Sequence, residues 1–298
     1  MSGPVLLTGA TGFLGAWITA ALMAEGRQVV ATDVAIDTSR LDALAPQGPA
    51  PDWRQLDVAD SAALDRLVAE TRPHAILHLA ALQIPACRAD PALGARVNVL
   101  GQINVLEAAR RHGLPVVYTS SVAAKPRGPA NAPANLYGVF KKTGEEIARL
   151  YWADHGVPSL GLRPHIVYGL GRDRGETSAI TAAILAAARG EPFEIPFATE
   201  SCFQYAGDVA ALFARAAAAR WEGAATADLS DRVESTDDVI AAIRAAVPDA
   251  RVTVAAEHRP SPTTGFDLAP LRAIVGDWTP TPLAQGVAAT VAMARTRA

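Results

Sequence analysis

The chain has 298 residues, of which 50% are hydrophobic and 19% are charged, and this composition excludes an intrinsically disordered protein. A formal net charge of −3 leaves no excess of positive charge for binding nucleic acid or an anionic membrane surface. Two cysteines are too few for a disulfide framework, and the apolar runs are too short for a signal peptide or a membrane span, so we expect a cytoplasmic globular protein.

Short apolar segments alternate with longer helical patterns through the first half of the chain. This alternation is typical of βαβ units, in which helical crossovers join parallel strands. We therefore predict an α/β protein with a doubly wound parallel sheet, whose ligand lies outside the carboxyl ends of the strands. Prolines punctuate the less regular second half, as expected of a smaller lobe added to the sheet. The expected strands are 5–8, 28–33, 53–58, 75–80, 116–121 and 160–164, and the expected helices are 13–25, 61–71, 95–112 and 136–155.

A glycine-rich loop joins the first expected strand to the first helix. Its first glycine permits a tight turn, its second lets a phosphate approach the backbone, and its third lets the helix pack closely on the strand. The helix N-terminus supplies free N–H groups and a positive dipole for a pyrophosphate. Structural turn glycines are the alternative, because the spacing G-x-x-G-x-x-G is not the commoner one. The loop residues expected to bind a dinucleotide are Gly9, Thr11, Gly12, Phe13, Leu14 and Gly15.

The second expected strand ends at an acidic residue, Asp33. A carboxylate there accepts hydrogen bonds from both adenosine-ribose hydroxyls and repels a 2′-phosphate. Residues 34–36 provide no arginine that would attract such a phosphate. The sequence therefore predicts NAD rather than NADP, with a simple turn residue as the alternative. The ends of the next two strands either border the cofactor or belong to the core, and they comprise Asp57, Val58, Leu79, Ala80 and Ala81.

Tyr137 and Lys141 lie four residues apart at the start of a long expected helix, so their side chains emerge on one face. A tyrosine with a pKa near 10 is a poor base at neutral pH, but a neighbouring ammonium favours the phenolate. Ser121, at the end of the fifth expected strand, supplies a hydroxyl that converges on the same edge of the sheet. The combination predicts proton transfer to or from a substrate oxygen, whereas a surface helix pair is the alternative.

Together these motifs resemble the extended branch of the short-chain dehydrogenase/reductase superfamily, the NAD-dependent epimerase/dehydratase family, over nearly the whole chain. The resemblance implies that Tyr137 is the catalytic acid/base, that Lys141 holds the nicotinamide ribose and tunes Tyr137, and that Ser121 polarises the substrate oxygen. It also implies that Asn98 supports the site from the helix behind it. Its motifs are the loop at 8–15, Asp57-Val58, 78–81, Asn98-Val99-Leu100-Gly101, Thr119-Ser120-Ser121, Tyr137-x-x-x-Lys141, 162–164, 167–169 and 276–280.

The same resemblance implies a Rossmann domain at residues 1–165, to which 204–222 returns. The substrate-binding lobe is then expected at 166–203 and 223–298. Further cofactor contacts implied by the resemblance are Thr119, Pro164 and Ile166. A homodimer is expected through the helices at 95–112 and 136–155, because such helices pair between subunits in this superfamily.

The sequence departs from nucleotide-sugar enzymes of this branch at two places. Ile166 stands where they usually carry an asparagine, and Ser201-Cys202-Phe203 replaces their usual Arg-Asp-Phe. Each missing charge-assisted hydrogen bond would cost a diphosphate ligand about 1.5–3 kcal/mol. We therefore expect a substrate other than a nucleoside-diphosphate sugar.

A glycine-bounded loop at 169–181 is expected to cover the pocket. Arg172 or Arg174 in this loop would bind a substrate carboxylate, although a solvated loop of mixed charge is an equal alternative. His165, Cys202 and Phe203 are further substrate-site candidates or packing residues. No metal site is expected, because the histidines at 74 and 78 would lie about 13 Å apart on a strand that rises about 3.3 Å per residue.

The leading functional hypothesis is an NAD-dependent oxidoreductase that transfers hydride between NAD and a secondary alcohol or ketone of a small polar substrate, such as one derived from a sugar. An epimerase or dehydratase that retains and recycles NAD is the alternative, since its chemistry begins with the same three residues. A dinucleotide-sensing module without turnover is a third hypothesis, and the presence of Ser121, Tyr137 and Lys141 argues against it.

Overall fold

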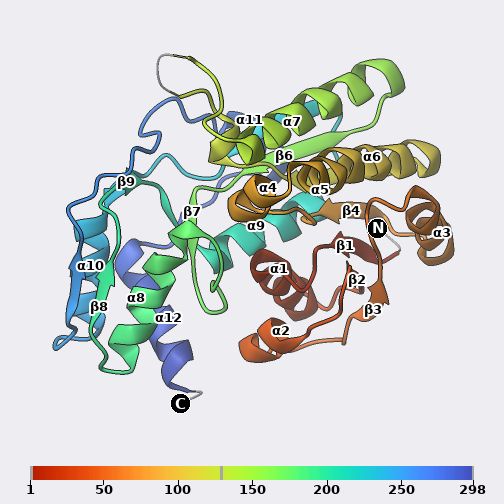
Figure 1. The fold of residues 1–298 in the computed structure, drawn as a ribbon. Coiled ribbons are helices and arrows are strands. Elements are labelled where there is room, and N and C mark those ends of the chain that lie inside the picture. Colours follow the sequence, from red (N-terminus) through yellow and green to blue (C-terminus); the bar gives the residue numbers. More distant parts are fainter. Residues whose placement is uncertain (1–2, 128–129, 297–298) are drawn as a thin grey trace.

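The computed structural model describes residues 3–127 and 130–296, and its centre is a seven-stranded sheet in which every neighbouring pair is parallel (Figure 1). In the strand order β11-β6-β5-β4-β1-β2-β3, the chain first adds β2 and β3 on one side of β1 and then adds the later strands on its other side. This is the doubly wound topology expected from the sequence. The strands are β1 (Val5–Thr8), β2 (Val29–Asp33), β3 (Asp52–Gln55), β4 (Ala75–His78), β5 (Val116–Thr119), β6 (Ser159–Arg163) and β11 (Ala224–Asp228).

Helices cover both faces of this sheet because successive strand residues point to opposite sides. Val5 and Leu7 pack with residues of α1 and α9, whereas Leu6 packs with residues of α3 and α6. The first face carries α1 (Phe13–Ala24), α9 (Ala206–Ala218) and α11 (Ala269–Val275), with α2 (Ser39–Leu44) beside α1. The second carries α3 (Ser61–Thr71), α6 (Gly101–His112) and α7 (Leu136–His155).

A smaller lobe, at the left of Figure 1, has an apolar core of its own. Three helices and three two-stranded pairs build it, and the pairs are β7 with β10, β8 with β13 and β9 with β12. Its elements are β7 (Ile166–Tyr168), α8 (Ala179–Ala188), β8 (Phe193–Ile195), β9 (Glu200–Ser201), β10 (Phe203–Tyr205), β12 (Glu234–Ser235), α10 (Thr236–Ala246), β13 (Val252–Val254) and α12 (Leu283–Arg295).

Two segments that the sequence assigns to the lobe lie on the sheet instead. β11 extends the sheet by pairing with β6, and Leu271 of α11 is buried in the core of the sheet's first face. Three of the five residues of β11 are alanines, which are depleted in strands, so its sequence gives little strand signal. The division between the two bodies therefore does not fall at residue 223.

Several strands end two or three residues earlier than expected. β3 ends at Gln55, β4 at His78 and β5 at Thr119. The candidate site residues that follow these strands (57–58, 79–81 and Ser121) therefore lie in loops at the carboxyl edge of the sheet. The expected helix at 95–112 is also interrupted, because a π-helical turn, Arg96–Leu100, precedes α6.

Short elements connect these parts. After β4 come α4 (Ile84–Ala89) and α5 (Pro91–Ala95), and single 3-10 turns lie at Val122–Ala124 and Glu176–Ser178. Within the described residues, no helix combines the length and apolar character that crossing a membrane requires.

Candidate functional site

The loop between β1 and α1 is shaped for a close approach by a phosphate. Gly9 has φ +73°, and a Cβ there would lie 2.6 Å from the backbone nitrogen of Ala80. A Cβ on Gly15 would overlap the carbonyl oxygen of Gly9. Gly12 directly precedes α1 and has an extended backbone, and its N-cap position provides no side-chain hydrogen bond to the helix. The N–H groups of the first turn therefore remain for an anion, which fits a dinucleotide pyrophosphate.

Asp33 lies beside this loop at the carboxyl end of β2. Its Oδ2 accepts hydrogen bonds from the backbone N–H and the hydroxyl of Thr11 at 3.1 and 2.7 Å. Its Oδ1 accepts one from the N–H of Val34 at 2.8 Å. These three hydrogen bonds leave one acceptor site of the carboxylate, on Oδ1, for a ribose hydroxyl.

Ser121, Tyr137 and Lys141 converge at the same edge from β5 and α7. Asn135 starts α7 by accepting a hydrogen bond from the N–H of Gly138 at 2.9 Å. The Lys141 ammonium donates to the carbonyl of Thr119 at 2.5 Å and lies 5.7 Å from the centroid of the Tyr137 ring. The Ser121 Oγ accepts from the N–H of Ala123 at 3.1 Å, which leaves its hydroxyl proton to donate.

Burial changes the ionisation of the pair on α7. It lowers the pKa of Lys141 to about 8. It also raises the pKa of the Tyr137 phenol, an effect that the Ser121 hydroxyl and the Arg172 guanidinium oppose. The local geometry therefore supplies a phenol whose ionisation depends on nearby positive charge.

Arg172 lies between Tyr137 and the loop that joins β1 to α1 (residues 9–12), which we call the phosphate loop. Its guanidinium is 5.6 Å from the centroid of the Phe13 ring, and one terminal nitrogen donates to the Thr177 hydroxyl at 3.3 Å. Its Nε is buried without a hydrogen-bond partner among the described residues, and burial lowers its pKa. An unpartnered buried donor of this kind is costly and fits an anionic ligand.

Hydrogen bonds and an ion pair hold the loop that carries Arg172 against the phosphate loop and α1. The indole of Trp17 donates to the carbonyl of Leu170 at 2.9 Å, and Arg40 donates to the carbonyl of Gly171 at 3.3 Å. Arg40 also contacts the carbonyl of Thr11 at 3.2 Å and both carboxylate oxygens of Asp173 at 2.9 and 2.7 Å. Sequence reasoning missed Trp17 and Arg40, because only the fold brings residues more than a hundred positions apart together.

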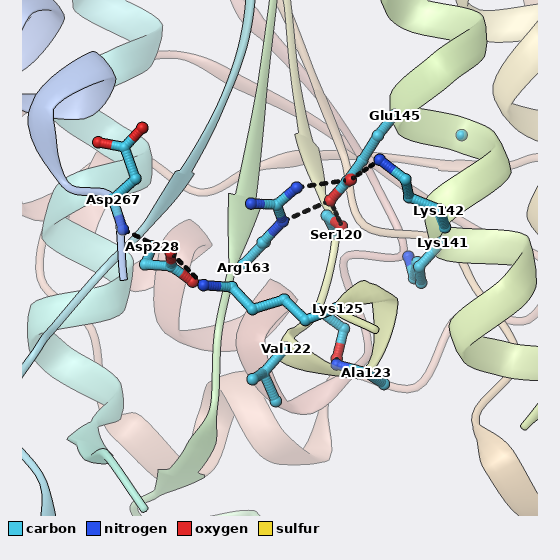
Figure 2. Close-up of polar contacts among 12 residues, drawn as sticks. Ser120, Val122, Ala123, Lys125, Lys141, Lys142, Glu145, Arg163, Asp228 and Asp267 are labelled. Carbon is cyan, nitrogen blue, oxygen red and sulfur yellow. Dashed lines mark hydrogen bonds and ion pairs between the residues drawn. The ribbon is translucent and has the colours of Figure 1, made fainter. Parts of the chain in front are cut away.

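A charged cluster bridges the loop after β5 and the end of β11 (Figure 2). The buried Asp228 accepts hydrogen bonds from the Lys125 ammonium and from the N–H of Asp267, both at 2.8 Å. The His165 side chain is fully buried beside it, with Nε2 3.6 Å from Asp228 Oδ1. Its ring lies 5.0 Å from that of Phe266. His165 is thus enclosed beside Asp228 and Phe266, where burial lowers its pKa.

The other cofactor candidates take varied positions. Asn98 exchanges hydrogen bonds with the backbone of Leu82 at 2.7 and 2.9 Å, so it stabilises the chain after β4. Asp57 pairs with Arg96 at 2.8 Å, whereas Val58 is buried. The partly exposed residues Leu79, Ala80 and Ala81 follow β4 beside Gly9, and Pro164 follows β6.

The remaining substrate candidates separate into buried and exposed residues. Ile166 and Phe203 belong to the apolar core of the lobe, because β7 and β10 pair with these side chains turned inward. Cys202 is fully buried, its thiol donates to the carbonyl of Ser230 at 3.5 Å, and burial raises its pKa to about 12. Arg174 is exposed. Within the described part of the chain, no three or more His, Cys, Asp and Glu side chains form a metal site.

Comparison with known proteins agrees with this geometry. The model of the NAD dependent epimerase/dehydratase family matches residues 5–230. A UDP-glucose 4-epimerase of Mycolicibacterium smegmatis is 34% identical over 190 residues, which are 59% of this chain and 60% of that protein. The chain therefore spans less than two thirds of the length of this curated relative.

Solved structures cover nearly the whole chain. A Thermus thermophilus UDP-glucose 4-epimerase in complex with NAD is 26% identical, with a TM-score of 0.78 and coverage of 98% of this chain and 99% of that one. An L-threonine dehydrogenase of Clostridium difficile is 19% identical and shares the fold, with a TM-score of 0.82 and coverage of 99% and 98%. The chain is thus a member of the NAD dependent epimerase/dehydratase family, within the extended short-chain dehydrogenases/reductases, with NAD as its cofactor.

Proposed function

We propose that the protein interconverts a secondary alcohol and a ketone on a small substrate that carries a carboxylate. The observation that carries this proposal is the position of Arg172, a partly buried residue between the phosphate loop and Tyr137 whose Nε has no hydrogen-bond partner among the described residues. A guanidinium in this position fits a carboxylate through two parallel hydrogen bonds. The proposed substrate is therefore a small anionic molecule, which is one kind of the small polar substrate expected from the sequence.

Ser121, Tyr137 and Lys141 have distinct roles in the proposed reaction. The Ser121 hydroxyl, whose oxygen already accepts from Ala123, donates a hydrogen bond to the substrate oxygen. The Tyr137 oxygen takes the alcohol proton during oxidation and returns it during reduction. The Lys141 ammonium stabilises the phenolate and, with Asp33 and the phosphate loop, holds the cofactor. NAD, when bound, supplies the hydride acceptor or donor.

A second candidate is an epimerase that retains NAD through its catalytic cycle. Two observations favour it, namely the similarity to UDP-glucose 4-epimerases and the fastening of the loop at 169–175 over the phosphate loop. Its substrate would differ from nucleotide sugars, because Ile166 and Ser201 stand where enzymes acting on those sugars usually carry an asparagine and an arginine. Net NADH formation with hydroxy acids supports the dehydrogenase, whereas isomer formation without net NADH supports the epimerase.

Replacing Arg172 with Met is expected to raise KM for a carboxylate substrate by about 10- to 100-fold, the equivalent of one charge-assisted interaction of about 1.5–3 kcal/mol. The measurement is NADH formation at 340 nm over a panel of hydroxy acids. Each acid is paired with its neutral amide, and the KM values for the amides should change little. Equal losses for acids and amides would contradict carboxylate binding by Arg172.

A homodimer is part of the same proposal. Exposed large hydrophobic side chains gather on α5, the π-helical turn and α7, where they are 41–47% accessible. They are Leu93, Leu100, Leu136, Val139 and Leu150. Exposed apolar side chains on neighbouring helical segments favour an interface there.

Sedimentation at micromolar concentration should therefore give twice the chain mass. Val139→Asp should give the single-chain mass, because it places a charge among these exposed apolar side chains. Ile36→Asp changes an equally exposed residue, 41% accessible, outside that face and should leave the dimer intact. A wild-type protein that sediments at the single-chain mass would refute the dimer.

A further inference from the structure

The carboxylate of Glu145 lies at the junction of three elements (Figure 2). Arg163 of β6 donates two hydrogen bonds to it, from Nε and Nη2, both at 2.6 Å. The hydroxyl of Ser120 donates a third at 2.6 Å, and the Lys142 ammonium lies 3.6 Å away. The side chain of Glu145 is only 3% exposed, so this is a buried and fully hydrogen-bonded carboxylate.

The hydrogen-bonding partners of Glu145 are connected through the backbone to Ser121 of the proposed catalytic set. Ser120 precedes Ser121, and its backbone N–H donates to the carbonyl of Leu162 at 2.7 Å. Arg163 precedes Pro164, whose carbonyl accepts from the residue after Ser121 at 3.1 Å. Glu145 itself follows Lys141 by one helical turn. One carboxylate therefore joins α7 to the ends of β5 and β6.

The opposite side of the same helical turn is also fixed. The buried side chain of Gln102 donates to the carbonyl of Gly144 at 2.9 Å. A Cβ on Gly144 would overlap the Gln102 side chain, so α6 and α7 approach as closely as a glycine allows. This turn of α7 cannot shift without breaking contacts on both sides.

We propose that Glu145 is a positioning residue, which sets the approach of Tyr137 and Lys141 to Ser121 and places a fixed negative charge near the Lys141 ammonium. The inference rests on the proposed function for its catalytic set. It assigns to the buried ion pair with Arg163 a role in the reaction as well as in stability.

The charges around Lys141 predict the direction in which the loss of Glu145 shifts the pKa of Lys141. Burial lowers the pKa of Lys141, whereas Cys87 on α4 and Glu145 on α7 raise it. His78 on β4 stays neutral because burial and Lys141 lower its pKa to about 3. Tyr137 also faces Lys141, whose Nζ lies 5.7 Å from the centroid of the tyrosine ring. Removing the charge of Glu145 therefore lowers the pKa of Lys141, and the ammonium is lost at a lower pH.

The chain has only three lysines, Lys125, Lys141 and Lys142, so the ionisation of Lys141 can be followed by NMR in protein labelled with ¹³C-lysine. Lys141→Arg assigns its signal. In Glu145→Gln we expect the Lys141 titration to move to lower pH. We also expect kcat to fall at least tenfold, with its alkaline limb displaced in the same direction. A titration of Lys141 that does not move would overturn the proposal.

A double variant separates position and charge from stability. Glu145→Gln alone leaves Arg163 without its carboxylate, and the second change, Arg163→Gln, removes that unpaired charge. The double variant should regain thermal stability while its Lys141 titration and kcat stay below those of the wild type. Recovery of all three would show that the pair is only structural. If the wild type turns over no substrate while the titration still moves, the proposed function fails and the placement of charge by Glu145 stands.

Discussion

Replacing Tyr137 with Phe is expected to lower kcat by about 10²- to 10⁴-fold, the usual contribution of a positioned general acid or base. The substitution removes one oxygen and keeps the ring, which packs at the start of α7. The dissociation constant for NADH should therefore change little, because Asp33, Lys141 and the phosphate loop are untouched. Tryptophan fluorescence quenching by NADH measures this binding independently of turnover.

A second tyrosine of α7 provides the matched control. The hydroxyl of Tyr151 donates to Glu107 at 2.9 Å, away from Ser121 and Lys141. Tyr151→Phe should therefore keep its activity although it loses the same atom. Near-normal turnover in Tyr137→Phe would contradict the assignment of Tyr137 as the acid/base.

The pH dependence of oxidation follows from the same environment. Burial raises the pKa of Tyr137, so the phenolate that accepts the proton forms only as the pH rises. The positive charges of Lys141 and Arg172 favour that phenolate. The rate of oxidation should therefore increase with pH until Lys141, whose pKa is lowered to about 8, loses its proton.

Local patterns predicted much of this fold because its determinants are local. The glycine loop, Asp33 and the Tyr137–Lys141 pair each lie within one strand–helix connection or one helix. Their spacing therefore carries the geometry directly. Helices α3 and α7 begin and end at the residues expected from sequence, and a capping aspartate or asparagine fixes the start of each one.

Contacts between distant segments were not predictable in this way. Arg40 meets Asp173, and Arg163 meets Glu145, only after the sheet has formed. The sequence shows an arginine in each place without its partner. The burial of Phe203 could not be predicted from the sequence either. It follows from the pairing of β10 with β7, which turns Phe203 toward the core of the lobe.

Replacing Gly15 with Ala is expected to weaken NADH binding by at least about 100-fold, which corresponds to the loss of two charge-assisted hydrogen bonds of about 1.5–3 kcal/mol each. The added Cβ would overlap the Gly9 carbonyl and lie 2.7 Å from the Cα of Ala10, and both are backbone atoms without freedom to rotate away. The phosphate loop must then move off the N-terminus of α1, which removes the N–H groups that hold a pyrophosphate.

Gly26→Ala separates this effect from lost stability. Gly26 has φ +69°, so alanine is strained there too, but nothing lies within 4 Å of its Cβ position and the residue is outside the phosphate loop. Both variants should unfold at lower denaturant concentration, because overpacking and left-handed strain each cost about 1–3 kcal/mol. Only Gly15→Ala should lose NADH affinity in fluorescence titration. If both variants bind NADH as the wild type does, the loop between β1 and α1 does not hold the pyrophosphate.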